Sequence, residues 1–114
     1  MRQRKIAQEC CDLGRKLIGE NDYEAATKEF SKAVMTFEFI LKHNLQQKAL
    51  KKEIADLLKT VIVPAYSNLA LCYLKNKKYD MVLTFANQVL QSDPANIKNL
   101  YRRAVARRHT KAYD

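Results

Sequence analysis

Apolar residues recur every three or four positions along most of the chain, which is the periodicity of amphipathic α-helices. The first such stretch runs from Lys5 to Ile18 and the second from Tyr23 to about Leu41. Two more run from Pro64 to Lys75 and from Tyr79 to Gln91, and a last one from Ala95 to about Arg108. The pattern therefore predicts an all-α protein whose helices are joined by short turns.

Short polar segments separate these helices and contain residues that end one helix and begin the next. The segment Gly19–Asp22 ends the first helix, and we expect Asn21 or Asp22 to cap the second. At the last helix we expect Asp93 as the cap, followed by Pro94 at the first helical position. Such short connections are typical of antiparallel helix pairs.

A small residue precedes a tyrosine and an acid by nine positions in three stretches of the chain. The small residues are Gly14, Ala70 and Ala104. Ala70 and Ala104 lie 34 residues apart, which is the period of a tetratricopeptide repeat, a unit of two antiparallel helices. We expect each small residue where the two helices of a unit approach closely, so that a larger side chain would overpack them. The sequence thus predicts an all-α array of tetratricopeptide helical hairpins.

The first two units are separated by more than one period. Gly14 and Ala70 lie 56 residues apart, which is 22 more than the 34-residue period. We expect this inserted segment to lengthen the first helix of repeat two, so that the array has about two and a half repeats and a lengthened linker helix. Pro64 should kink that helix or set its start, because proline lacks an amide donor.

We therefore expect a single tetratricopeptide-repeat domain over residues 1–114. Its parts are repeat one at about 5–42, an inserted helical extension at about 45–63, repeat two at about 64–92 and partial repeat three at about 95–114. Repeat three has only its first helix, which would leave an apolar flank uncovered. Because helical repeats need capping neighbours, the chain is expected to be a fragment.

Composition narrows the class of protein. The chain has 114 residues, of which 47% are hydrophobic and 29% charged, as in a soluble globular domain. No run of ~18 apolar residues occurs, so we expect no membrane contact. The three cysteines and two histidines show no metal-site spacing, which indicates reduced thiols in a cytoplasmic protein and no cofactor or metal. No catalytic constellation or phosphate loop occurs, so we expect no enzyme.

The formal net charge of +9 indicates an acidic partner, which is a nucleic acid, an anionic lipid or a carboxylate-rich peptide. Spacings of four place Arg103, Arg107 and Lys111 on one stripe of the last helix, away from Lys98 and Arg102. This stripe lacks interleaved aromatic residues and any zinc-finger or RNP signature. A solvated or packed flank is therefore favoured over a nucleic-acid site.

Three polar residues are candidates for binding a peptide. Lys98 and Arg102 are four positions apart and share one face of the last helix. Asn68 lies 30 residues before Lys98, at the matching depth in the first helix of repeat two. First helices line the concave surface of such an array, so all three should face one groove and receive a carboxylate. The alternative for a Lys/Arg pair at this spacing is a solvated helix face.

The segments around these residues resemble the repeat domain of the large immunophilins, which are peptidyl-prolyl isomerase co-chaperones. The similar segments are Asn68–Lys75, Ser92–Asn96 and Lys98–Ala104, and the resemblance covers nearly the whole chain. It implies a "carboxylate clamp", which in that family holds the acidic C-terminal tail (Glu-Glu-Val-Asp) of the seventy- and ninety-kilodalton heat-shock chaperones.

Carried over by register, the resemblance implies five peptide-binding positions. Asn68, Lys98 and Arg102 match the family, whereas Cys11 and Arg15 stand where the family has lysine and asparagine. We hypothesise that Arg15 replaces the missing lysine, because it supplies a cation one helical turn further along the same face. The alternative for Arg15 is a solvated surface residue.

Two interpretations remain for the chain as a whole. The first is an interaction module of a co-chaperone that binds an acidic chaperone tail. The second is a scaffold domain that contacts another protein in a larger assembly without binding such a tail, which the departures at Cys11 and Arg15 favour. The two are distinguished by titration with a tail peptide.

Overall fold

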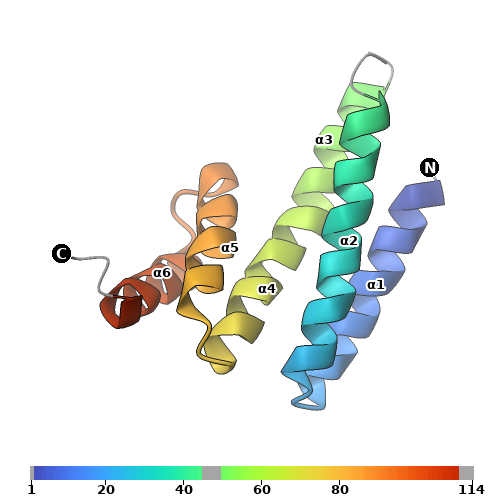
Figure 1. Ribbon diagram of the computed structural model, residues 1–114. Coiled ribbons are helices and arrows are strands. Elements are labelled where there is room, and N and C mark those ends of the chain that lie inside the picture. Colours follow the sequence, from blue (N-terminus) through green and yellow to red (C-terminus); the bar gives the residue numbers. More distant parts are fainter. Residues whose placement is uncertain (1, 45–49, 111–114) are drawn as a thin grey trace.

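Helices follow one another along the chain in the computed structural model, which describes residues 2–44 and 50–110. Their bounds are α1 (Arg2–Gly19), α2 (Tyr23–Asn44), α3 (Lys51–Leu57), the π-helical turn η2 (Leu58–Ile62), α4 (Val63–Lys75), α5 (Tyr79–Ser92) and α6 (Ile97–Thr110). Figure 1 shows them in a row in chain order, with α1 at one end and α6 at the other. Within the described ranges there is no strand, and the predicted all-α array is confirmed.

Helix pairs form the units of the array. α1 packs against α2, α4 packs against α5, and α2 packs against α4 and so joins the two units. α6 packs against α5 and begins the third unit. The largest fully buried side chains of the core lie between these helices, and they include Phe30, Ile40, Leu57, Ile62 and Leu69. The residues at 111–114, which we predicted to belong to repeat three, lie outside the described chain.

The small residues of the repeat register mark close helix approaches in the first two units. Gly14 is buried, and a Cβ atom added there would lie 2.7 Å from the ring of Phe30. Ala70 is fully buried, and the residue equivalent to Phe30 in repeat two is Ala86, which is also fully buried. Ala104 is exposed, contrary to the prediction, because no further helix packs on that face of α6 among the described residues.

The turns inside the two complete units have the same backbone pattern. Asn21 and Lys77 have positive φ angles of 60° and 59°, and they too lie 56 residues apart. In each turn, the next residue donates its amide to the carbonyl five positions earlier, with an N···O distance of 2.9 Å. This is the Schellman closure of a helix C-terminus. The backbone thus repeats with the same offset as Gly14 and Ala70.

The helix starts agree with the sequence prediction at α2 and differ at α6. The Asp22 carboxylate accepts the backbone N–H of Ala25 at 3.1 Å, so Asp22 caps α2 as predicted. The prediction of Asp93 as the cap of α6 is wrong. α6 begins two residues later than expected, and its cap is Asn96, whose Oδ1 accepts the backbone N–H of Asn99 at 2.9 Å. Asp93 instead ends α5 and accepts the Asn96 amide through its carbonyl.

The inserted segment lengthens the first helix of repeat two, as predicted. α3, η2 and α4 form one uninterrupted helix over Lys51–Lys75. At η2 the helix changes from α to π geometry, in which each hydrogen bond spans five residues instead of four. The amide of Val63 donates to the carbonyl of Leu58, five positions earlier. Pro64 follows at the start of α4. Since the proline ring clashes with the preceding turn of an α-helix, the wider π-turn accommodates it without ending the helix. Residues 45–49 of the predicted extension lie outside the described chain.

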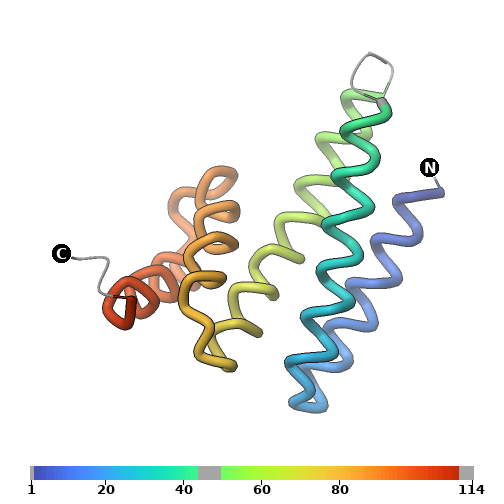
Figure 2. Tube along the Cα trace, in the orientation of Figure 1, coloured from blue at the N-terminus to red at the C-terminus, as the bar shows by residue number. Residues whose placement is uncertain are grey.

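This long helix is the central element of the array. Among the described residues, it is long and apolar enough by length and composition to cross a membrane, although its sequence has no unbroken run of ~18 apolar residues. Figure 2 shows it running between α2 and α5. Leu57, Ile62 and Leu69 along it are fully buried against the neighbouring helices. The core helix of a globular fold can meet the same criterion of length and apolarity.

Candidate peptide-binding site

Arg102 lies where α6 meets α4, and only one side of its guanidinium group is bonded. Its Nη1 donates to the backbone carbonyl of Ser67 at 2.9 Å and to the Ser67 hydroxyl at 3.0 Å. A third, longer contact of 3.5 Å reaches Oδ1 of Asn99. Its Nη2 and Nε atoms donate no hydrogen bond to any residue in the described ranges. Partial burial lowers the pKa of Arg102, since desolvation disfavours the charged form.

The described part of the chain offers Arg102 no carboxylate. The ion pairs there join Arg4 to Asp56, Arg15 to Asp12 and Lys32 to Glu29. A half-buried cation without an anionic partner is unfavourable, because it has lost water and gained no opposite charge. The site is therefore suited to receive an anion.

Asn99 supports this arginine from inside the array, and it is the one fully buried polar side chain of the described residues. Its Nδ2 donates to the Ser67 hydroxyl at 3.1 Å and to Oδ1 of Asn96 at 2.9 Å. The equivalent residue of repeat two, one period earlier, is the buried Ala65. The sequence prediction missed Asn99 and Ser67. The available signal was a polar residue where repeat two has a buried alanine, although repeat one has the exposed Glu9 there.

Lys98 lies one turn before Arg102, at the exposed start of α6. It lines a surface hollow of about 520 Å³ together with Pro64 and Ser67 of α4 and Asn96. Its ammonium group forms no ion pair with a described residue. Ser67, which accepts the hydrogen bonds of Arg102, therefore also lines the hollow at Lys98.

Asn68 is the neighbour of Ser67 in α4 and is half-buried. Successive side chains on an α-helix point about 100° apart, so Asn68 lies on the adjoining face of α4. Its carboxamide makes no hydrogen bond with another residue of the described ranges. The structure thus brings Arg102 into contact with Ser67 and places Lys98 in a hollow that Ser67 also lines, while Asn68 follows Ser67 along α4.

The two predicted positions of the first repeat have different surroundings. Cys11 is 2% exposed, and its thiol points to the carbonyl of Val61 in η2 at 3.9 Å. Burial raises the pKa of the Cys11 thiol to about 11, so it stays protonated at neutral pH. The prediction that Cys11 faces a ligand does not hold, because the inserted helix covers it. Arg15 is exposed one turn further along α1 and forms an ion pair with Asp12 of the same helix.

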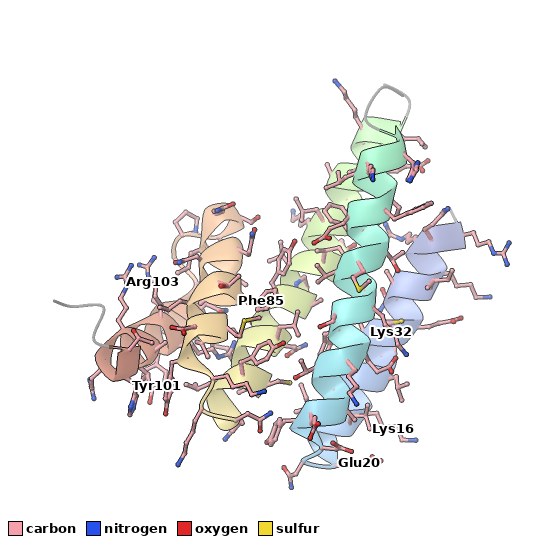
Figure 3. All side chains as sticks on the ribbon, viewed as in Figure 1. Lys16, Glu20, Lys32, Phe85, Tyr101 and Arg103 are labelled. Carbon is pink, nitrogen blue, oxygen red and sulfur yellow. The ribbon has the colours of Figure 1, made fainter. Side chains whose placement is uncertain are left out.

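Several of the remaining aromatic and basic residues contact a neighbouring helix. Tyr66 and Tyr73 of α4 both stack on Phe85 of α5, each with ring centroids 5.9 Å apart, which agrees with the predicted interhelix packing. Arg103 of the predicted basic stripe donates to Oδ1 of Asn87 on α5 at 3.2 Å. Phe85 and Arg103 are labelled in Figure 3 on α5 and α6. Of the predicted stripe, Arg103 thus contacts α5 and Arg107 is exposed, whereas Lys111 lies outside the described chain.

The helix order, the matching turns and the 34-residue period together define a tetratricopeptide-repeat array. No family model matches the chain. It is 39% identical over 66 residues to tetratricopeptide repeat protein 9C of Xenopus tropicalis, a match that covers 56% of the chain and 37% of that relative. It is 30% identical over 104 residues to peptidyl-prolyl cis-trans isomerase D of Kluyveromyces lactis, covering 88% of the chain and 27% of that relative.

The chain is thus a tetratricopeptide-repeat domain that resembles the repeat domain of immunophilin-type co-chaperones. It spans well under half the length of either relative. These similarities support a protein–protein interaction module.

Proposed function

We propose that this chain is the non-catalytic docking domain of a cytoplasmic co-chaperone. Its ligand is the acidic C-terminal tail of a heat-shock chaperone of the seventy- or ninety-kilodalton class. The proposed binding residues are Asn68, Lys98 and Arg102, with Arg15 from the first repeat, and no cofactor or metal takes part. The observation that supports this function most strongly is the half-buried guanidinium group of Arg102, which has no carboxylate partner among the described residues.

The free edge of Arg102 suits a carboxylate. Nε and Nη2 lie along one edge of the planar guanidinium group, and their N–H groups can donate to the two oxygens of a carboxylate. Ser67 and Asn99 occupy the opposite nitrogen, Nη1, and so fix the orientation of this edge. Each charge-assisted hydrogen bond contributes about 1.5–3 kcal/mol. A terminal carboxylate or an acidic side chain of the tail therefore gains a specific, bidentate contact.

The other residues add charge and hydrogen bonds around the same position. Lys98 supplies a second cation one helical turn from Arg102, without an internal partner among the described residues. Asn68 offers amide hydrogens for a second oxygen of the tail. Arg15 supplies a cation from the first repeat, although Asp12 neutralises part of its charge. The proposed site therefore has its strongest contacts on repeats two and three.

The alternative is a scaffold domain that contacts another protein without binding an acidic tail. The burial of Cys11 and the Arg15–Asp12 pair favour it, because they leave the first repeat with less free charge than the family has. In that case Arg102 only joins α6 to α4 through Ser67. The alternative predicts that removing Lys98 has no effect on any acidic peptide.

Isothermal titration calorimetry of an acetylated Glu-Glu-Val-Asp peptide tests the proposal. Lys98→Ala is the informative variant, because Lys98 is exposed and its removal leaves the core intact. Arg107→Ala is the matched control, since it removes one exposed cation from the same helix on the stripe away from the groove. We expect about tenfold weaker binding for Lys98→Ala and little change for Arg107→Ala. Equal losses in both variants, or no binding to the parent chain, would refute the clamp.

A further inference from the structure

Two surface hollows lie side by side along the lengthened helix and share three lining residues, Lys59, Val63 and Asp93. Their volumes are about 530 and 520 Å³. One wall comes from the long helix and the other from the turn between α5 and α6. Because the hollows share residues, they form one continuous depression, which we call the extension groove. It ends at Lys98 of the proposed clamp.

The inserted segment creates this groove. Ala55, Leu58 and Lys59 line it, and all three lie in the extension that precedes repeat two. Leu58 and Lys59 belong to the π-turn η2 itself. Without the insertion, the first helix of repeat two would begin near Pro64, and this wall would be missing. Isolated π-turns inside α-helices occur frequently at functional sites.

The groove combines apolar surface with two cations, Lys59 where the two hollows meet and Lys98 in the second hollow. Lys59 and Lys98 are both exposed, and neither forms an ion pair with a described residue. Val63 and Ile97 line the same hollow as these two lysines, and Ile97 is 81% exposed. The one acid of the groove, Asp93, accepts a hydrogen bond from Nδ2 of Asn96 at 3.2 Å. These features fit an extended peptide in which an apolar side chain is flanked by acidic residues.

We propose that the extension groove binds the peptide segment that immediately precedes the acidic C-terminal tail. An acidic side chain of that segment pairs with Lys59, and an apolar side chain covers Val63 and Ile97. This inference rests on the proposed function, because the tail held at Lys98 directs the preceding residues into the groove. The insertion thereby adds selectivity for the sequence upstream of the tail, beyond recognition of the tail itself.

Titration of the parent chain with three acetylated peptides tests the groove. The short probe is Gly-Glu-Glu-Val-Asp, the extended probe is Gly-Asp-Leu-Ser-Gly-Glu-Glu-Val-Asp, and the length control is Gly-Ser-Gly-Ser-Gly-Glu-Glu-Val-Asp. We expect the extended probe to bind about fivefold to tenfold more tightly than the other two, since it adds one charge pair and one apolar contact. Equal affinity for all three probes would overturn the groove and leave the clamp intact. No binding of any probe would overturn the proposed function and the groove with it.

Two variants locate the gain on the structure. Lys59→Ala and Ile97→Ser change exposed side chains, so the fold is retained. Each should reduce the affinity for the extended probe by about threefold and leave the affinity for the short probe unchanged. Lys51→Ala is the matched control, because it removes one exposed lysine from the same helix outside the groove. An equal loss in Lys51→Ala would show a general charge effect and refute the groove. Sedimentation of the parent chain and of Ile97→Ser provides a second check. If the parent chain were a dimer and Ile97→Ser made it a monomer, the proposed peptide groove would be refuted.

Discussion

Replacing Gly14 by alanine should destabilise the array, although the same change normally stabilises a helix. A Cβ atom at Gly14 would lie 2.7, 2.8 and 2.9 Å from three ring carbons of Phe30. Carbon atoms in contact are about 3.5–4.0 Å apart, so the ring must move by most of 1 Å. Phe30 is fully buried and has no free space to move into.

The magnitude follows from two opposing terms. Overpacking a well-packed core costs about 1–3 kcal/mol, whereas replacing a helical glycine by alanine contributes about 1 kcal/mol to stability. We therefore expect Gly14→Ala to lower the free energy of unfolding by about 1 kcal/mol, which corresponds to a fall in Tm of about 4 °C for a domain of this size. Urea and thermal unfolding followed by circular dichroism measure both quantities.

Two comparisons separate overpacking from other effects. Gly19→Ala is the matched control in the same helix, because a Cβ atom there would meet nothing within 4 Å, and it should stabilise the chain slightly. In a Phe30→Leu background, Gly14→Ala should become neutral or stabilising, since the smaller side chain leaves room for the methyl group. The pair Ala70 and Ala86 already combines two small residues at the equivalent positions of repeat two. If Gly14→Ala had the same effect in both backgrounds, the close approach of Gly14 and Phe30 would not be the cause.

Three further predictions concern single residues. Lys77→Gly should raise the free energy of unfolding by about 0.5–1 kcal/mol, because the φ angle of 59° strains a non-glycine residue; a decrease in urea unfolding would contradict this. Cys11 has a pKa raised from 9.0 to about 11, so its contribution to stability is complete below pH 9 and declines as the pH rises through 11. A Cys11→Ala variant should lack this decline. If the free energy of unfolding of the variant fell with pH as it does in the parent chain, the prediction would be wrong. Arg15→Ala should weaken binding of the tail peptide about threefold to tenfold in calorimetry, and an unchanged affinity would disprove its role as the replacement cation.

The sequence pattern predicted the helices and the repeat, because both depend on local spacing. Gly14 and Ala70 revealed the offset between the first two units, and the αL turns at Asn21 and Lys77 repeat it in the backbone. The cap of α6 was wrong because Asp93 and Asn96 are both good capping residues. The choice between them depends on tertiary structure, since Asn96 also binds the buried side chain of Asn99.

The predicted site residues came from register, and register does not describe the surroundings of a side chain. Cys11 stands at a position that the resemblance assigned to the clamp, but its thiol lies beside the Val61 carbonyl of η2 and it is part of the core. Ser67 and Asn99 were missed because their importance arises from contacts between α4 and α6. The orientation of Arg102 is set by these contacts, so it was not readable from residue spacing alone.

We propose that cations at the junction of α4 and α6 receive the terminal carboxylate of an acidic tail. The most direct test compares the acetylated Glu-Glu-Val-Asp peptide with a free C-terminus and the same peptide with an amidated C-terminus, by calorimetry at one fixed salt concentration. Amidation removes the terminal charge and leaves the acidic side chains unchanged. We predict measurable binding of the free peptide and at least about tenfold weaker binding of the amidated one. Equal affinities for the two peptides would contradict the account.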